Sequence, residues 1–245
     1  MTQLDPAWSA DQLPVHDKEV LVRSGSVAVA GQLTIPEHPI GIVIFVHGSG
    51  SSRHSPRNRF VADVLNSGGL ATLLFDLLTP EEERNRANVF DVELLSARLV
   101  AVINWLADQP QTSALPVGLF GASTGAGAAL AAAADPRMRP AAVVSRGGRP
   151  DLAGSALARV GAPTLLIVGG RDEVVLALNR RAQAMMPGVC ELAVVPGATH
   201  LFEEPGTLDQ AAHLARDWFL RYLGDEQSDR HGCYRQPHGN QHGHR

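Results

Sequence analysis

Apolar residues form short uninterrupted runs that alternate with longer segments of helical periodicity through most of the chain. Uninterrupted apolar runs are typical of strands that are buried on both faces, as in parallel sheets. The predicted strands are 19–23, 27–35, 42–46, 71–77, 117–120, 141–145, 164–168 and 191–195. The predicted helices are 57–67, 91–108, 126–134, 174–186 and one that begins near 207. This alternation predicts an α/β fold, in which a mostly parallel sheet of about eight strands carries helices on both faces.

Local signals refine both ends of this pattern. The first two predicted strands flank Ser24-Gly25-Ser26, which is a spacing typical of a hairpin. The sheet should therefore carry antiparallel strands at one edge. Thr207 and Gln210 form a capping-box pattern at the start of the last helix.

The domain is expected to span 19–224. An N-terminal leader over 1–18 is polar and has no basic segment followed by an apolar one, so it is not expected to be a signal peptide. The tail over 225–245 has many His, Gly, Gln and Arg residues and almost none that could be buried, which predicts disorder. The tail lacks a scaffold that would fix ligand geometry, so we do not expect a metal site there.

Gly121-Ala122-Ser123-Thr124-Gly125 joins an apolar predicted strand to an alanine-rich predicted helix. A serine on such a sharp turn adopts a strained backbone conformation, so the residues around it must be small. Both flanking positions are glycine here. The same pattern also arises by chance in glycine-rich turns that have no chemistry, so other residues must support Ser123 as a nucleophile.

Polar residues follow the later predicted strands. In parallel sheets, functional groups gather at the carboxyl ends of the strands. Ser123 follows the fifth predicted strand, Asp172 the seventh and His200 the eighth. A serine hydroxyl needs an imidazole to accept its proton, and a carboxylate must orient that imidazole. The arrangement predicts a catalytic triad in which Ser123 is the nucleophile, His200 the base and Asp172 the acid.

Each of these assignments has an alternative. Asp172 could simply cap the helix that begins near 174, and Asp151, which follows the sixth predicted strand, is the second candidate acid. His200 could be an ordinary loop histidine that bonds to the backbone. We expect structural roles for His47 and His54, with His47 anchoring the loop that follows the third strand.

The amino-acid composition mainly argues against two classes of partner, nucleic acids and membranes. A chain of 245 residues with 44% hydrophobic residues suits a single α/β domain. The net charge of -4 shows no bias toward nucleic acid, and no apolar stretch approaches the roughly 18 residues of a membrane span, so neither partner is expected. Cys190 and Cys233 give no disulfide framework, which favours a cytoplasmic protein. Cys190 should pack beside a strand as a small hydrophobe.

The elbow, the chain order Ser-Asp-His and the loop His47-Gly48-Ser49 together resemble the α/β-hydrolase superfamily over about 19–223. The absence of a large insertion and the segments 75–80 and 146–152 are similar to dienelactone hydrolase-like proteins. Dienelactone hydrolases proper carry cysteine at the elbow, where this chain has Ser123. The resemblance therefore implies a serine esterase-type reaction, and their particular lactone substrate is not carried over.

The resemblance also implies an oxyanion hole, because the superfamily uses the N–H of the residue after the nucleophile and one from the loop after the third strand. These positions are Thr124 and Ser49, with Gly50 in place of Ser49 if the loop winds differently. Fixed donors aimed at the developing negative charge stabilise the transition state more than the substrate. No metal or cofactor is implied by this chemistry.

Fewer than twenty residues separate the sixth and seventh predicted strands, too few for a helical lid. An open site holds little apolar surface for a long acyl chain, which favours small or medium esters. The loop 78–88 is expected to form one wall. Arg146 follows the sixth strand and is a candidate for binding a carboxylate on the substrate, unless Arg146 or Arg149 pairs with Asp151 instead.

Together these residues predict a serine hydrolase that cleaves carboxylic esters or lactones through an acyl-enzyme on Ser123. A thioesterase or acyltransferase that uses the same triad is the alternative among enzymes. A non-catalytic α/β-hydrolase-fold module that binds a ligand or partner is the alternative outside them.

Overall fold

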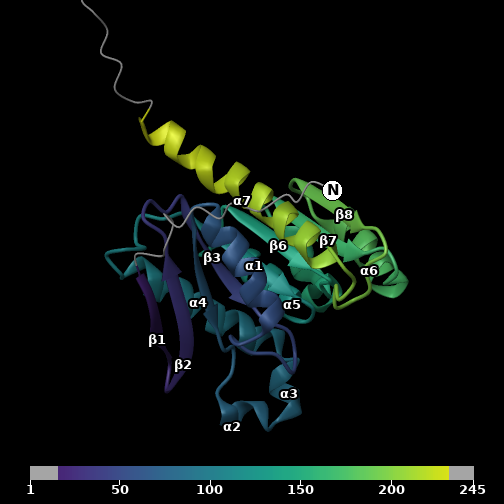
Figure 1. The fold of residues 1–245 in the computed structure, drawn as a ribbon. Helices are drawn as coiled ribbons and strands as arrows, with labels where there is room; N and C mark the ends of the chain where they lie inside the picture. The colour runs from purple at the N-terminus through teal and green to yellow at the C-terminus, as the bar shows by residue number, and fades with distance from the viewer. Residues whose placement is uncertain (1–15, 232–245) are drawn as a thin grey trace, which may run out of the picture.

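The computed structural model describes residues 16–231, and for 225–231 it describes only the course of a helix. An eight-stranded sheet forms the centre of the fold, with helices packed on both faces (Figure 1). The strands are β1 (His16–Ser24), β2 (Val27–Ile35), β3 (Gly41–Val46), β4 (Leu70–Phe75), β5 (Val117–Ala122), β6 (Ala142–Arg146), β7 (Thr164–Gly169) and β8 (Cys190–Val195). Their order across the sheet is β1-β2-β4-β3-β5-β6-β7-β8. The predicted α/β architecture is confirmed.

Antiparallel pairing is confined to one edge of the sheet. β1 pairs with β2 and β2 with β4 in antiparallel fashion, whereas the strands from β4 across to β8 are parallel. The hairpin between β1 and β2 turns at Gly25, whose φ of 62° is readily adopted by glycine. Because the six strands β3 to β8 run the same way, their carboxyl ends lie at one edge and bring the following loops together.

The helices form two layers. On one face lie α1 (Pro56–Ser67) and α7 (Thr207–His231), which pack against each other. On the other face lie α4 (Val92–Ala107), α5 (Gly125–Ala133), the 3-10 segment η1 (Pro150–Arg159) and α6 (Glu173–Met185). The periodicity of α4 predicts a buried stripe of Val92, Leu95, Leu99, Val102 and Leu106, and all of these are buried except Val92, which is half-buried. Burial of these apolar stripes against the sheet supplies most of the driving force for folding.

The segment 78–88 forms two short helices, although a loop was expected there. They are α2 (Pro80–Glu83) and α3 (Arg86–Val89). Thr79 and Glu82 cap α2 reciprocally, and Glu82 also accepts a hydrogen bond of 2.8 Å from the buried guanidinium of Arg98 on α4. The charged run therefore turns back onto the domain, because one of its carboxylates has a buried partner.

The predicted capping box at the start of α7 is wrong. Thr207 is the first residue of the helix, and its hydroxyl donates to the carbonyl of Glu204 at 2.8 Å. α7 also continues to His231, past the predicted domain end at 224, and β1 begins at His16, inside the predicted leader. The rest of the leader (1–15) and of the His-rich tail (232–245) lies outside the described residues.

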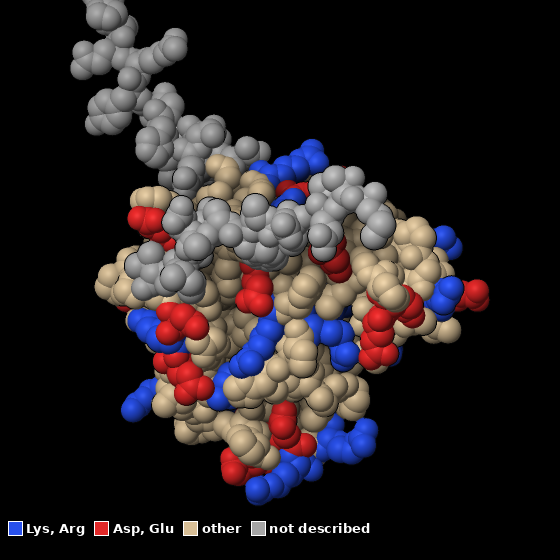
Figure 2. Space-filling model, in the orientation of Figure 1, with Lys and Arg blue, Asp and Glu red and all other residues tan. Residues whose placement is uncertain are grey.

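The surface of the described fold carries mixed charge. Figure 2 shows acidic and basic side chains interspersed over the face that is turned to the viewer. Among residues 16–231, no helix combines the length and apolar character that crossing a membrane requires.

The turn from β5 into α5 depends on two glycines. A Cβ on Gly121 would lie 2.5 Å from the Cα of Ala126, and a Cβ on Gly125 would overlap the carbonyl oxygen of Val46. Contacts with backbone atoms at such distances leave no room for a side chain. The two glycines therefore allow α5 to begin directly against β5 and β3.

Replacing Gly121 by alanine should destabilise the fold by about 1–3 kcal/mol, since overpacking forces the backbone apart. The measurement is the urea midpoint of unfolding. Gly161→Ala is the matched control, because nothing lies within 4 Å of a Cβ at Gly161. Equal midpoints for the two variants would contradict the packing argument.

Candidate active site

Ser123 lies directly after β5 with a φ of 50°. This left-handed conformation is rare for a residue with a Cβ, and it stores strain. The N–H of Ser123 donates to the carbonyl of Arg146 at 3.2 Å, and the N–H of Arg149 donates to the carbonyl of Ser123 at 2.9 Å. Backbone bonds to the segment after β6 therefore hold the turn and fix the hydroxyl at the edge of the sheet.

The three predicted triad residues lie together. Oγ of Ser123 lies 3.2 Å from Nε2 of His200, and Nδ1 of His200 lies 2.6 Å from Oδ2 of Asp172. Asp172 occupies the N-cap position of α6, but its side chain caps no helical N–H, because its carboxylate contacts the imidazole instead. A carboxylate at Nδ1 places the ring proton there and leaves Nε2 able to accept the serine proton.

The other residues considered in the sequence lie outside the hydrogen bonds of the triad. Asp151 forms a two-point ion pair with Arg149 at 2.8 and 2.7 Å. His54 is exposed and contacts Arg59, and Cys190 is half-buried against the core, where burial raises the pKa of its thiol to about 11. In the described part of the chain, no group of three or more His, Cys, Asp or Glu side chains is arranged to hold a metal ion.

The loop that carries His200 is fixed on both sides of the imidazole. The N–H of Thr199 donates to Oε2 of Glu204 at 3.0 Å. Phe202 is buried with a φ of 55°, and its ring centre lies 5.9 Å from the guanidinium carbon of Arg146. The position of His200 therefore follows from a buried aromatic anchor and a backbone bond within the loop.

The predicted oxyanion donors are close to each other. The N–H of Ser49 donates to Oγ1 of Thr124 at 2.8 Å, so this donor already has an acceptor. The N–H groups of Thr124 and Gly50 have no acceptor among the described residues. Thr124 lies at the N-terminal end of α5, whose dipole favours negative charge at this point.

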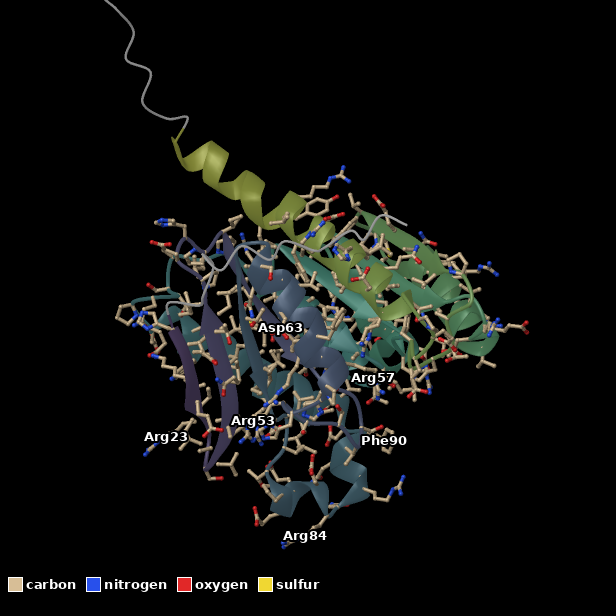
Figure 3. All side chains as sticks on the ribbon, viewed as in Figure 1. Arg23, Arg53, Arg57, Asp63, Arg84 and Phe90 are labelled. Carbon is tan, nitrogen blue, oxygen red and sulfur yellow. The ribbon has the colours of Figure 1, made fainter. Side chains whose placement is uncertain are left out.

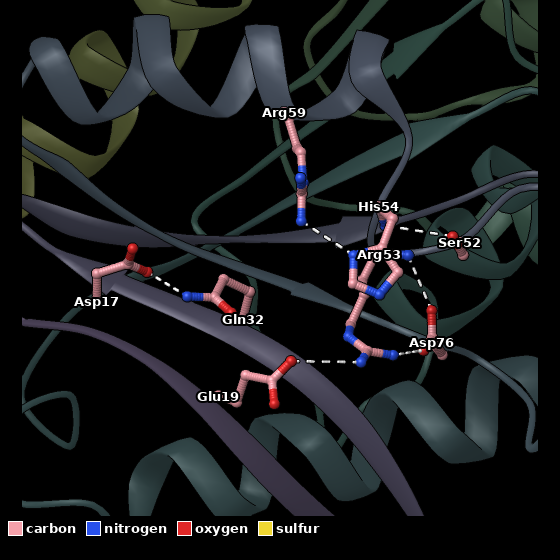
Figure 4. A network of polar contacts seen from close by, with 8 residues as sticks. All are labelled: Asp17, Glu19, Gln32, Ser52, Arg53, His54, Arg59 and Asp76. Carbon is pink, nitrogen blue, oxygen red and sulfur yellow. Dashed lines mark hydrogen bonds and ion pairs between the residues drawn. The ribbon is translucent and has the colours of Figure 1, made fainter.

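Two side chains tie the loop after β3 to the segment after β4. His47 is buried, with Nδ1 placed 2.9 Å from the carbonyl oxygen of Gly48 and Nε2 accepting the N–H of Leu77 at 3.1 Å. Burial lowers the pKa of His47, which keeps the ring neutral as these bonds require. Arg53 forms an ion pair with Asp76, and the same carboxylate accepts the backbone N–H of Arg53 (Figure 4). These contacts agree with the predicted anchoring role of His47.

Ser123 and His200 line a cavity of about 250 Å³. A second cavity of about 630 Å³ shares part of its lining, and Glu83 of α2 and Val89 of α3 form part of its wall. From the segment 78–88, only Glu83 lines this second cavity, and no residue of the segment lines the cavity that contains Ser123. Between β6 and β7, η1 packs against α5 and α6.

Arginine and asparagine side chains complete the smaller cavity. Arg57 and Asn58, at the start of α1, line it together with Arg146. Nη2 of Arg146 donates to Oδ1 of Asn58 at 3.3 Å, and Arg146 has no ion pair within the described residues. Sequence reasoning missed Arg57 and Asn58, because the only signal was that their helix follows a strand-end loop.

A mostly parallel sheet of this order, with a strained serine after β5 and its histidine and aspartate partners after later strands, defines an α/β hydrolase. The solved structure of Est1E from Butyrivibrio proteoclasticus has the same fold. It is 15% identical with a TM-score of 0.71, and the match covers 84% of this chain and 98% of that chain.

Within that class, the chain belongs to the dienelactone hydrolase family. The sequence profile of the "Dienelactone hydrolase family" matches residues 29–223. The crystal structure of a dienelactone hydrolase from Anabaena variabilis ATCC 29413 is 56% identical, with a TM-score of 0.82. The match covers 85% of this chain and 98% of that chain.

Two curated relatives come from Mycobacterium tuberculosis strains CDC 1551 / Oshkosh and ATCC 25618 / H37Rv, and each is named "Putative phosphoribosyl transferase". Each is 72% identical over 210 residues, and the match covers 86% of this chain. The same match covers 47% of the relative, so the chain spans about half the length of these proteins.

The buried imidazole of His47 makes stability depend on pH. Burial lowers the folded-state pKa of His47 below the ordinary histidine value of 6.5, so below that pH the unfolded chain takes up a proton that the folded chain does not. As the pH decreases below about 6.5, the free energy of unfolding should decrease by at most about 1.4 kcal/mol per pH unit, until the folded-state pKa of His47 is reached. Urea titrations at about pH 7.5 and about pH 5.5 should show a smaller loss for His47→Gln than for the wild type.

The exposed histidine at position 54 provides the control. In His54→Gln the replaced ring is exposed, and the loss of stability between the two pH values in this variant is compared with that in His47→Gln. A wild-type pH dependence in His47→Gln would show that this imidazole does not contribute.

Proposed function

We propose that this protein is a serine hydrolase that cleaves small or medium carboxylic esters or lactones, with Ser123, His200 and Asp172 as its triad. The main support for the proposal is the series of hydrogen bonds that joins Ser123 to His200 and His200 to Asp172, beside a cavity. Membership of the dienelactone hydrolase family supports hydrolytic chemistry in general.

In the first half of the reaction, Oγ of Ser123 attacks the carbonyl carbon while Nε2 of His200 takes the hydroxyl proton. The oxyanion of the tetrahedral intermediate would accept from the N–H of Thr124 and from that of Ser49 or Gly50. The C–O bond then breaks, and His200 returns the proton to the leaving alcohol. In the second half, His200 activates water, which attacks the acyl-enzyme, releases the acid and restores Ser123.

The cavity favours a small acyl or alcohol group next to Ser123. Its volume of about 250 Å³ lies below the roughly 300–1,000 Å³ of sites that hold drug-sized ligands. The adjoining cavity of about 630 Å³ offers space for the remainder of a medium-sized ester.

We attribute the activity named for the M. tuberculosis relatives to the part of those proteins that this chain does not match. The match covers 47% of their length. Phosphoribosyl transfer displaces a group at a sugar carbon, and a serine with its own general base serves attack on a carbonyl instead. The triad therefore favours acyl chemistry for the matched half.

Two further alternatives use the same fold. A thioesterase or acyltransferase would employ the same triad, and panels of esters, thioesters and acyl acceptors with product analysis separate these reactions. A non-catalytic binding module would bind such ligands without turnover, and its Ser123 would not react with an activated phosphonate.

Ser123→Ala should abolish labelling by a fluorophosphonate probe and lower the kcat for ester hydrolysis by about 10⁴-fold or more, since the nucleophile is lost. The measurements are gel-based labelling and steady-state kinetics. Circular dichroism and urea unfolding should confirm that the variant remains folded. Labelling that persists in folded Ser123→Ala would overturn the assignment.

The two candidate acids can be separated by isosteric substitutions. Asp172→Asn should lower kcat by up to about 10⁴-fold, because the amide no longer holds the imidazole in the required tautomer. Asp151→Asn, which breaks only the ion pair with Arg149, should retain the wild-type kcat. The opposite ranking of the two variants would reassign the acid.

A further inference from the structure

A buried arginine lies beside Ser123 without a counter-ion. Arg146 is 8% exposed, and its Nη1 has no hydrogen-bond partner. Burial lowers the pKa of Arg146 to about 10, helped by the nearby positive charge of Arg57, so the guanidinium still carries its charge at neutral pH. A buried cation that lacks a counter-ion costs free energy. The position therefore suits an anion that enters with the substrate.

The second cation of this cavity is Arg57. Its side chain is 39% exposed and lies 3.4 Å from the carboxylate of Glu203, which is 63% exposed. Ion pairs at this exposure contribute little, so Arg57 is able to exchange Glu203 for a ligand. Arg57 also lies in the first turn of the twelve-residue helix α1, and its backbone N–H has no acceptor among the described residues. The N-terminus of a helix favours bound anions.

Hydroxyl groups add further donors around the same space. Ser51 and Ser55 line the cavity together with both arginines. Guanidinium, backbone N–H and hydroxyl donors thus come from the loop after β3, from α1 and from the end of β6. Such a set suits an anion with several acceptor oxygens.

Both arginines contact the loop that carries His200. Arg146 lies over the ring of Phe202, and Arg57 pairs with Glu203. His200 must reach the oxygen of the leaving alcohol to return the proton to it. Both cations therefore lie beside the loop that carries this proton donor.

From these contacts we infer that the substrate is an ester whose alcohol portion carries a phosphate group, which Arg57 and Arg146 bind. The inference rests on the proposed hydrolase function. A phosphate dianion balances two guanidinium charges, and its three terminal oxygens match the surrounding donors, whereas a carboxylate leaves one positive charge unbalanced. Water cleaves the acyl C–O bond, which yields a carboxylic acid and the phosphorylated alcohol. The phosphate ester bond remains intact.

A matched set of three aryl acetates tests the substrate class. The probes are 4-acetoxyphenyl phosphate, 4-acetoxybenzoate and 4-tolyl acetate, each assayed by acetate release and normalised to its hydroxide-catalysed rate. The wild type should show a kcat/KM for the phosphate probe that is about tenfold or more above that for the tolyl ester, with the carboxylate probe between them.

Three substitutions connect this preference to the arginines. Arg57→Met and Arg146→Met should each reduce the ratio of kcat/KM between the phosphate and tolyl probes about tenfold. Arg23→Met is the matched control, since Arg23 is exposed on β1, well away from Arg57 (Figure 3). It should retain the wild-type ratio.

Two measurements that need no substrate turnover distinguish phosphate binding by the arginines from a purely structural role. Isothermal titration with inorganic phosphate should show saturable binding to the wild type and to Arg23→Met, and weaker binding to the other two variants. Folded Arg146→Met should have a melting temperature at or above that of the wild type, because it removes an unpaired buried charge. A large loss of stability in Arg146→Met, with an unchanged probe ratio in Arg57→Met, would indicate a structural arginine and overturn the inference.

The outcomes distinguish the two proposals. Equal rates for the three esters, or a preference for the carboxylate probe, would overturn the phosphate inference and leave the hydrolase intact. Failure to hydrolyse any ester, together with an unlabelled Ser123, would overturn both, even if inorganic phosphate binds.

Discussion

The close approach of β5, β3 and α5 is the constraint on which the site depends. A serine with a φ of 50° persists only when its surroundings over-determine it, and here Gly121 and Gly125 let β5, β3 and α5 approach closely. The strain is balanced by backbone bonds from Ser123 to Arg146 and Arg149. Arg146, the last residue of β6, also lines the cavity with its guanidinium group. Nucleophile geometry and the candidate anion site therefore share one short segment.

Much of this arrangement could be predicted from the sequence. The strands β3 to β7 are mostly apolar because both of their faces are covered, and the residues after parallel strands meet at one edge. That rule was enough to place Ser123, Asp172 and His200 together.

The remaining features depend either on contacts between distant segments or on local caps that the sequence pattern placed wrongly or missed. Arg57 enters the cavity because α1 follows the loop after β3, which no local pattern marks. The two short helices in 78–88 carry a local signal, the Thr79–Glu82 capping box, and the pair between Glu82 and Arg98 then holds α2 against α4. The predicted capping box at Thr207 was wrong because α7 begins at Thr207 itself, one residue earlier than the pattern suggested. The Thr207 hydroxyl therefore donates to the carbonyl of Glu204.

The hydrogen bond between the N–H of Ser49 and Oγ1 of Thr124 has a consequence for selectivity between bound states. If this N–H serves the oxyanion, a substrate carbonyl that displaces the hydroxyl exchanges one neutral acceptor for another and gains little. An oxyanion is an acceptor of roughly twice the strength, so the exchange becomes favourable only once charge has developed. Because Oγ1 of Thr124 competes for the N–H of Ser49, this N–H binds the charged tetrahedral intermediate more readily than the neutral substrate carbonyl.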